Sequence, residues 1–472
     1  MTQHPSRRDA LLKIGGGFGG LALLDLLGRE SALGETSARP WMTQPIKVKR
    51  VIQLFMNGGV SQMDTFDYKP ELEKQHDRPF DPGKGEHVEA ATSAPGKVMK
   101  SCFAFKRHGA CGRWVSAVFP KMAECVDDLA FLMALGSKTN VHGPASYLMN
   151  TGFLIPGFPS MGAWISYGLG SLVDNLPTFV VLPDPKGLPY NAKGNFTSGF
   201  LPMTHQGTLL DASSPTPVPD LFISKGSPEL TETAEREGLR MLALQNRRHA
   251  QARPGDSRLD ARIASYELAA KMQLAAPEAL DLQGETAATK TLYGLDEPVT
   301  EDFGRRCLLA RRMIERGVRF VQVWSGAGGP ANNWDNHANI PKELSSIARS
   351  VDQPIAGLLR DLKARGLLAD TLVIFSTEFG RMPFTQKSTG RDHNGGTSVA
   401  WLAGAGIKGG VTQGASDDWS WKAQEGKTSG YDLHATILHL MGVDHTRLAV
   451  RHNGIDRRLT DVHGKVIREI LL

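Results

Sequence analysis

The sequence predicts an α/β fold built on a mostly parallel sheet. Short, mostly apolar runs recur along the chain after Pro40, and helical patterns lie between them. Strands of a parallel sheet are covered on both faces, so continuous apolar runs are their expected signature. The chain has 472 residues, 41% of them hydrophobic and 22% charged, which is a globular composition with enough length for a large core.

The first predicted strand spans Arg50 to Met56 and ends in Asn57-Gly58-Gly59, which marks a turn. Further apolar runs predict strands over 129–135, 176–182, 318–324, 371–376 and 398–403. The helical patterns span 229–251, 259–274, 302–316 and 342–365. Two polar segments rich in Pro and Gly, 69–100 and 183–219, are predicted surface loops.

Charge and cysteine content exclude several classes of protein. Lys and Arg number 54 and Asp and Glu 49, so the net charge is only +5, and no dense basic run appears. We therefore expect no nucleic-acid partner. The four cysteines, Cys102, Cys111, Cys125 and Cys307, are too few for a disulfide scaffold and match no zinc-binding spacing.

The N-terminus resembles a twin-arginine export signal. Ser6-Arg7-Arg8 is followed by Lys13 and by a glycine-rich apolar run over 14–27. Asp25 interrupts this run, which is too short for a comfortable membrane span. We expect residues 1–40 to form the signal and a linker, and residues 41–472 to form one domain. The expected partner is the twin-arginine export machinery, the expected location is the periplasm, and we expect no stable membrane span in the mature form.

Acidic and histidine side chains follow several of the predicted strands. In an open α/β sheet, ligands collect beyond the carboxyl ends of the strands. Oxygen and imidazole donors that converge at one sheet edge are suited to a divalent metal ion. The candidate metal ligands in these loops are Asp64, Asp335, His337, Glu378, Asp392 and His393.

Asp335, His337, Glu378 and His393 form the expected core of the metal site. This donor set suits Zn, Mn or Ca, and the ion would lower the pKa of a bound water molecule. Asp64 or Asp392 supplies a further oxygen in the same hypothesis.

Three more side chains are predicted to be catalytic. His142 follows the second strand, and the sequence leaves it open as a metal ligand, a general base or a nucleophile. Arg381 and Arg391 are expected to bind an oxyanion and to stabilise developing charge.

Three segments resemble sulfatase motifs and occur in the same order. Residues 141–152 resemble the sulfatase signature, 373–381 the strand that ends in Asp-His-Gly-Glu, and 431–442 the late sulfatase helix. More closely, the chain resembles the exported bacterial family called domain of unknown function fifteen-zero-one. Its marks here are the segments 57–67, 334–337, 377–381, 390–393 and 458–464.

This family is grouped with the alkaline phosphatase/sulfatase superfamily. The resemblance implies an alkaline-phosphatase-like three-layer α/β/α sandwich. It also implies an exported, metal-dependent hydrolase whose substrate is a small-molecule or glycan ester of phosphate or sulfate.

The sequence departs from the superfamily at four positions. Asn57 replaces a metal-binding Asp, His142 stands at the position of the Cys or Ser nucleophile, Ser146 replaces an Arg, and Phe379 replaces a His ligand. These changes argue against a two-zinc phosphatase and exclude formylglycine chemistry at this position. The alternative is a non-catalytic member that binds a sulfated or phosphorylated glycan or a partner protein. Isomerase or phosphotransfer chemistry also stays open.

Overall fold

The computed structural model describes residues 39–83, 85–214, 232–253, 259, 262–263, 266–267 and 278–472. Its centre is a sheet in the order β12-β4-β11-β8-β1-β7-β5-β6, with β15 also paired to β4. All of these pairs are parallel except the two made by β11. The strands are β1 (Arg50–Met56), β4 (Leu129–Gly136), β5 (Phe179–Leu182), β6 (Thr208–Leu209), β7 (Phe320–Ser325), β8 (Thr371–Ser376), β11 (Ser398–Gly404), β12 (Val411–Gln413) and β15 (Thr428–Ser429).

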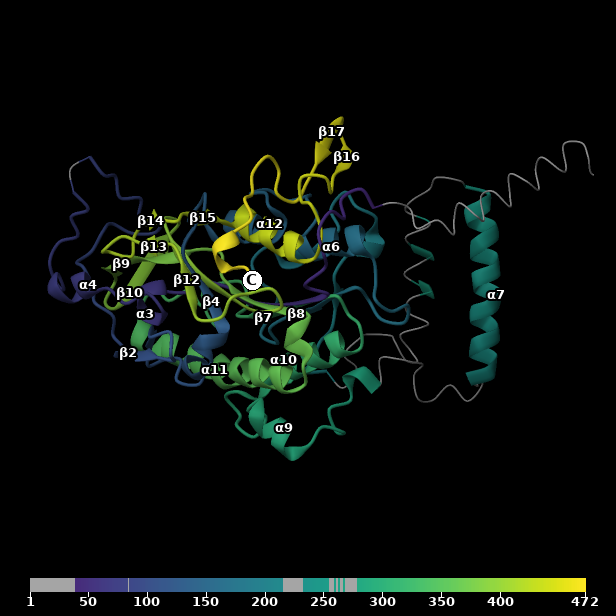
Figure 1. The fold of residues 1–472 in the computed structure, drawn as a ribbon, viewed down its shortest axis with the longest axis horizontal. Helices are drawn as coiled ribbons and strands as arrows, with labels where there is room; N and C mark the ends of the chain where they lie inside the picture. Colours follow the sequence, from purple (N-terminus) through teal and green to yellow (C-terminus); the bar gives the residue numbers. More distant parts are fainter. Residues whose placement is uncertain are drawn as a thin grey trace, which may run out of the picture.

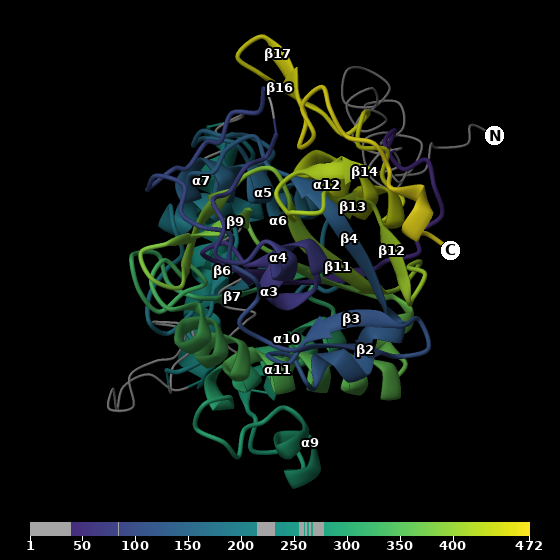
Figure 2. The same cartoon turned by 90° about the vertical axis from the view of Figure 1, so that its left-hand side faces the viewer.

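Helices cover both faces of this sheet, as Figures 1 and 2 show. One layer contains α10 (Glu301–Glu315) and α11 (Ile340–Ala364). The opposite layer contains α5 (His142–Thr151), α6 (Met161–Leu169) and α12 (Gly430–Leu440). The predicted three-layer α/β/α sandwich with a mostly parallel sheet is therefore confirmed.

Strand β1 shows how the sheet connects the two layers. Ile52 and Leu54 belong to the core cluster that includes α10 and α11, whereas Val51 and Phe55 belong to the cluster that includes α6 and α12. Successive side chains of a strand point to opposite faces, and here both faces are apolar. This double burial explains why the strand reads as a continuous hydrophobic run.

The predicted strands agree with the structure to within a few residues. β1 and β8 have the predicted bounds, and β4 and β11 each extend one residue further. β5 begins at Phe179 rather than Leu176, after Pro177, which has no N–H to donate to a ladder. β7 begins two residues later than predicted, at Phe320.

The helix ends follow local capping chemistry. The side chain of Asn339 accepts a hydrogen bond from the Lys342 N–H at the start of α11, and Ser429 and Asp432 form a capping box on α12. α10 and α11 begin and end within two residues of the prediction.

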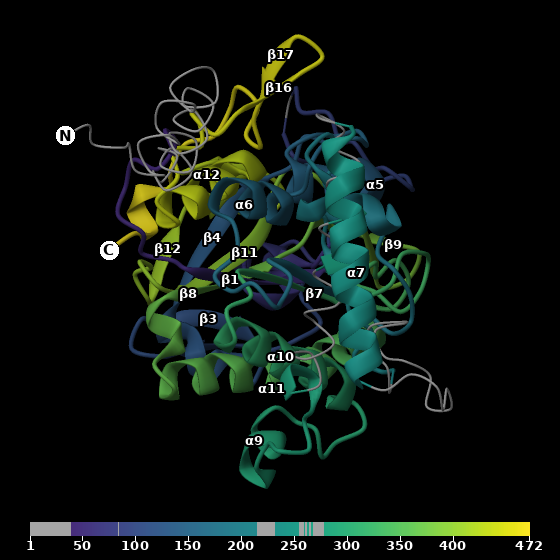
Figure 3. The same ribbon diagram turned by 90° about the vertical axis from the view of Figure 1, so that its right-hand side faces the viewer.

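The remaining elements are short hairpins, turns and one separate helix. Helix α7 stands to one side of the layers in Figure 1 and lies in front of them in Figure 3. The helices and strands outside the central sheet and its two helical layers are α3 (Gln62–Thr65), α4 (Pro70–Lys74), α7 (Glu232–Gln251), α9 (Ala287–Leu292), β2 (Phe105–His108), β3 (Arg113–Ser116), β9 (Gly380–Gln386), β10 (Gly390–Asn394), β13 (Ala415–Ser416), β14 (Ala423–Glu425), β16 (Val450–His452) and β17 (Ile455–Arg457).

Two predicted segments lie wholly or mostly outside the residues that the structure describes. The export signal lies outside the described residues, as does most of the helix predicted over 259–274. None of the helices in the described ranges has the length and apolar character required to cross a membrane.

Candidate metal site

Four candidate ligands meet at the carboxyl edge of the sheet. His142 is the first residue of α5, directly after β4, and Asp335 and His337 lie between β7 and α11. His393 lies in β10, which pairs with β9 so that His393 faces Arg381 in register. Three segments far apart in the sequence thus converge at the edge of the sheet where its parallel strands end.

His142, Asp335, His337 and His393 form a compact cluster. One possible ligand atom from each lies within 4.8 Å of all the others. The Asp335 Oδ1 atom is 3.2 Å from His142 Nε2, 2.7 Å from His337 Nε2 and 3.1 Å from His393 Nε2. The side chains are 7% to 20% exposed, so the cluster is mostly shielded from solvent.

The other ring nitrogen of each imidazole contacts a different acceptor. His142 Nδ1 is 2.6 Å from Glu378 Oε1, and His393 Nδ1 is 2.8 Å from the Asn140 carbonyl. Carboxylate and carbonyl oxygens only accept, so these Nδ1–H groups donate. His337 Nδ1 contacts Gln386 Oε1 in the same way. In the neutral rings, the three Nε2 lone pairs therefore face the centre of the cluster.

This arrangement fits a bound cation. The Nε2 atoms of His337 and His393 are only 2.8 Å apart, and two lone pairs at that separation repel unless a positive charge lies between them. The buried His142 Nε2 atom has no hydrogen-bond partner. Metal-binding histidines usually donate their second N–H to an acceptor behind the ring, as all three do here.

Burial and ion pairing shift the protonation equilibria in opposite directions. Burial alone would lower the pKa of His142, but the carboxylates of Asp335 and Glu378 beside its two ring nitrogens outweigh burial and raise it. Burial lowers the pKa of His393. Burial would raise the pKa of Asp335, but Arg381 and the three imidazoles hold it far below its usual range. Asp335 is therefore an anion that is available as a ligand.

Two glycines allow the segments to approach. A Cβ atom on Gly58 would lie 2.6 Å from the Asp335 nitrogen, and a Cβ on Gly390 would lie 1.9 Å from the His337 carbonyl oxygen. Gly58 also has a φ of +123°, a conformation that L side chains rarely adopt. Both glycines are therefore needed for the backbone positions of Asp335 and His337.

Arg381 is fully buried and contacts the cluster from one side. Its guanidinium donates to Asp335 Oδ1 at 2.6 Å, to the Gly59 carbonyl at 2.8 Å and to the Gly58 carbonyl. It therefore fixes the Asp335 carboxylate against the turn after β1. These bonds occupy the N–H groups that the sequence analysis assigned to an oxyanion.

Asp64 and Arg391 form a separate ion pair. Both side chains are fully buried, and Arg391 Nε is 2.7 Å from Asp64 Oδ2. Ser61 also donates to Asp64, and Arg391 donates to the Met99 carbonyl. Neither residue belongs to the cluster found among the described residues.

Glu378 and Asp392 also lie outside the four-residue cluster. Glu378 contacts the Nδ1 atom of the candidate metal ligand His142, and it accepts a hydrogen bond from the Gly58 N–H at 2.8 Å. Asp392 accepts from the backbone N–H groups of Thr92 and Ser93. The structure therefore places these two carboxylates in supporting positions.

Sequence reasoning missed Gln386 and Asn140. Gln386 ends β9 and has no neighbouring motif, and Asn140 acts through its backbone carbonyl, which every residue type has. A single sequence contains no signal for either contact. The departures at Asn57 and Phe379 do have visible consequences. Asn57 donates to the Gly326 and Ala327 carbonyls, and the Phe379 ring contacts the rings of His142 and His393.

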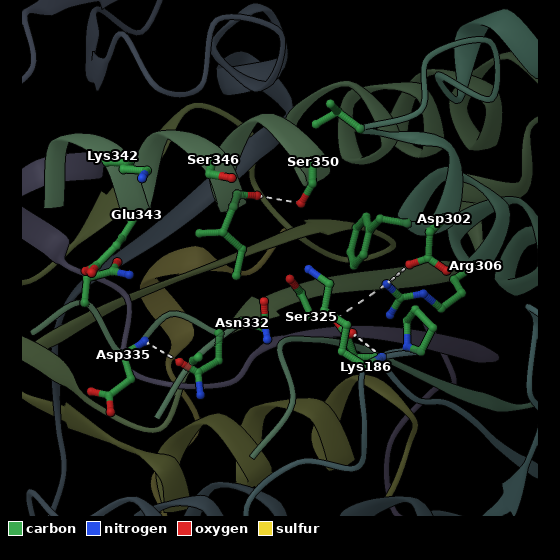
Figure 4. A pocket seen from close by; sticks show the side chains of 18 of the residues that line it. Lys186, Asp302, Arg306, Ser325, Asn332, Asp335, Lys342, Glu343, Ser346 and Ser350 are labelled. Carbon is green, nitrogen blue, oxygen red and sulfur yellow. Dashed lines mark hydrogen bonds and ion pairs between the residues drawn. The ribbon is translucent and has the colours of Figure 1, made fainter. Parts of the chain in front are cut away.

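A cavity of about 600 Å³ adjoins the cluster and is shown in Figure 4. Its walls include the start of α11, the start of α10 and the segment that carries Asp335. In Figure 4 the Asp335 carboxylate points away from this cavity. The cavity and the cluster are therefore on the two sides of one loop.

Comparison with known families decides which family this is. The family model described as "Protein of unknown function (DUF1501)" matches residues 48–471. The chain belongs to this family. The resemblance noted in the sequence motifs is thereby confirmed for almost the whole chain. No curated protein matches the chain.

DUF1501 proteins have no assigned activity in that description, and the solved structures that match this chain are distant from it. One is the lipoteichoic acid synthase LtaP from Listeria monocytogenes, with 9% sequence identity and a TM-score of 0.33. The match covers 84% of this chain and 73% of the synthase chain. The PsFucS1 sulfatase from Pseudoalteromonas sp. has 14% sequence identity and a TM-score of 0.35, and the match covers 87% of this chain and 74% of the sulfatase chain. The alkaline phosphatase from the Antarctic bacterium TAB5 has 12% sequence identity and a TM-score of 0.33, and the match covers 85% of this chain and 99% of the phosphatase chain.

Proposed function

We propose that this DUF1501 protein is a metal-dependent hydrolase of phosphate or sulfate esters. The observation that supports it most strongly is the cluster of His142, Asp335, His337 and His393, in which three Nε2 atoms converge on one carboxylate oxygen. Three imidazoles and one carboxylate favour zinc over calcium, because calcium prefers a shell of oxygens. A bound divalent cation would polarise the ester and lower the pKa of a water molecule.

The protein's own groups have distinct tasks in this proposal. Glu378 orients His142 and makes it a stronger donor through the hydrogen bond to Nδ1. Arg381 positions Asp335 and compensates part of its charge. His142 serves as a ligand, so the nucleophile and general-base roles left open by the sequence are not needed.

A binding protein without turnover is the second candidate. Asn57 and Phe379 occupy positions that supply metal ligands in the superfamily, and here one donates to backbone carbonyls while the other packs on imidazole rings. These replacements leave the described residues with donors for one ion. Such a site can bind an ester without cleaving it.

Metal content and hydrolysis together separate the two candidates. We expect protein purified without chelator to contain about one tightly bound divalent ion per chain. We expect it to hydrolyse p-nitrophenyl phosphate or p-nitrophenyl sulfate, a chelator to abolish turnover, and zinc to restore it. His337→Ala should remove both the metal and the activity. The matched control His87→Ala changes an exposed histidine outside the cluster and should alter neither.

The two failures have different meanings. Folded protein that contains no metal and binds none on titration would overturn the metallohydrolase. Protein that binds metal and retains the nitrophenyl esters without product would favour the binding role.

We also propose that the protein is exported through the twin-arginine pathway. The paired Arg7 and Arg8, followed by a short apolar run, support this. A twin-lysine variant, Arg7→Lys/Arg8→Lys, should keep the protein inside the cell, as measured by periplasmic fractionation. Equal periplasmic recovery of both forms would exclude this route.

A further inference from the structure

Tyr190 packs flat against the imidazole of the candidate ligand His142. The centroids of the two rings are 4.3 Å apart, and their planes differ by only 7°. The His142 Nδ1 atom also donates to Glu378, as described above. The hydrogen bond restricts rotation of the imidazole within its plane, and the stacked ring restricts its tilt out of that plane. Tyr190 therefore supplies a restraint that Glu378 cannot give.

The other end of Tyr190 is anchored in the loop that leads to Asp335. The Tyr190 hydroxyl donates to the Gly329 carbonyl at 2.9 Å. Asn333 Nδ2 donates to the same carbonyl at 2.6 Å, and Asn333 Oδ1 accepts from the Asp335 N–H at 3.0 Å. One carbonyl and one side-chain amide thus connect the Tyr190 hydroxyl to the Asp335 backbone. The tyrosine contacts His142 at one end and this loop at the other.

The backbone around Tyr190 is fixed against helix α5. Asn191 Nδ2 donates to the Gly143 carbonyl at 2.7 Å. The buried Asn195 joins the two segments, because its Oδ1 atom accepts from the Ser146 hydroxyl at 3.1 Å and its Nδ2 atom donates to the Tyr190 carbonyl. Gly143 and Ser146 belong to the first turns of α5, which begins with the stacked imidazole. These bonds hold the Tyr190 ring at the start of this helix.

Tyr190 acts on its neighbours and is not assigned as a metal ligand, because its hydroxyl is already bonded to a carbonyl. The residue is half-buried in the connection between β5 and β6, inside the segment 183–219 that the sequence analysis predicted as a surface loop. It lies in none of the motifs found in the sequence. A tyrosine that only filled space would need neither the stacked imidazole nor the anchored hydroxyl.

We propose that Tyr190 is a positioning residue that sets the geometry between His142 and Asp335 for a bound metal ion. The His142 Nε2 and Asp335 Oδ1 atoms are 3.2 Å apart. Ligand atoms that are held in place before an ion arrives lose less conformational freedom on binding, which raises the affinity. Tyr190 achieves this by holding the ring plane of one ligand and the loop of the other. This role rests on the metal site of the function proposed above, but it requires no turnover.

Two substitutions of Tyr190 in the full-length protein separate the ring from the hydroxyl. Tyr190→Leu removes both and should weaken zinc affinity by about 10–100-fold, the range for groups that support metal ligands from behind. Tyr190→Phe keeps the stacked ring, so its zinc affinity should fall by less than about tenfold, the effect of one lost hydrogen bond. Competition with a zinc chelator measures both. Tyr190→Met fills similar space without an aromatic ring, should match Tyr190→Leu, and replaces it if the leucine variant does not fold.

Tyr147→Leu is the matched control. Tyr147 is a half-buried tyrosine of α5 whose hydroxyl packs against the same segment at Gly194, where an added Cβ would lie 2.4 Å from it. This variant should keep the wild-type zinc affinity. The visible spectrum of the cobalt-loaded protein depends on ligand geometry, so it should change in Tyr190→Leu and stay unchanged in Tyr147→Leu.

Three results would overturn this role of Tyr190 alone. They are wild-type zinc affinity in Tyr190→Leu, an equal loss of affinity in Tyr147→Leu, and a loss in Tyr190→Phe as large as that in Tyr190→Leu. In each case the wild-type protein still binds zinc, so the function proposed above stands. Folded wild-type protein that binds no zinc would instead refute the metal site, and the positioning role with it.

Discussion

Two buried groups of charged residues at the same sheet edge differ in how their charges and hydrogen-bonding groups are matched. Asp64 and Arg391 form a closed pair in which each charge has its counter-charge and its hydrogen bonds. The cluster around Asp335 instead directs three imidazole nitrogens at one another. A closed pair needs nothing from outside, whereas facing lone pairs need a cation. Residues of the same types thus serve structure in one place and a candidate metal site in the other.

Removing Arg391 should have the largest effect on stability. Arg391→Leu leaves the Asp64 carboxylate buried and unpaired, which costs about 3–5 kcal/mol of unfolding free energy. Urea unfolding of the metal-free protein measures this loss of unfolding free energy. The double variant Asp64→Leu/Arg391→Leu should recover much of the loss, because an apolar pair has no uncompensated charge. A loss of metal affinity with unchanged stability would instead place Arg391 in the metal site.

Removing one imidazole should mainly affect metal binding. His337→Ala should weaken zinc affinity by more than about 100-fold, since even the groups behind metal ligands contribute about 10–100-fold. Competition with a fluorescent zinc chelator measures this. His434→Gln is the matched control, because His434 is a fully buried imidazole that contacts the Met149 carbonyl outside the cluster. Equal zinc affinities in the two variants would contradict the assignment of His337.

Asp352 gives a third kind of buried carboxylate. It accepts hydrogen bonds from the Lys121 and Met122 N–H groups, and burial raises its pKa from 3.8 to about 6. Between these pH values the folded protein binds this proton more readily than the unfolded chain does. The unfolding free energy therefore falls as pH rises from about 4 to about 6, by up to about 3 kcal/mol.

Asp352→Asn should remove this pH-dependent loss. The stability of the variant relative to the wild type should rise between pH 4 and pH 7, as measured by urea unfolding at both values. A constant difference between the two proteins across this range would show that Asp352 does not retain a proton on folding.

The smallest expected effect concerns the group behind a ligand. Glu378→Gln removes the charge behind His142 and should lower zinc affinity by about 10–100-fold without abolishing binding. Glu425→Gln, which neutralises an exposed carboxylate on β14, is the control and should not change the affinity. Complete loss of zinc in Glu378→Gln would make Glu378 a ligand, as the sequence analysis expected.

The supporting contacts explain why the expected site differs from the observed cluster. Asp335, His337 and His393 lie together as expected, because each follows or belongs to a segment at the carboxyl edge of the sheet. His142 joins them through its place at the start of α5. Glu378 was an equally good candidate by residue type and position, and only its contact with Nδ1 of His142 places it behind the ligand.

The sequence alone determined the fold class, most strand positions and the loops that carry the chemistry. These follow from local patterns, since apolar runs specify buried strands and parallel strands direct their following loops to one edge. The tertiary structure decided which charges are paired. Arg391 binds Asp64 across 327 positions of sequence, and Arg381 binds Asp335 across 46. Such pairings depend on distances of a few ångströms between remote segments, which no local pattern contains.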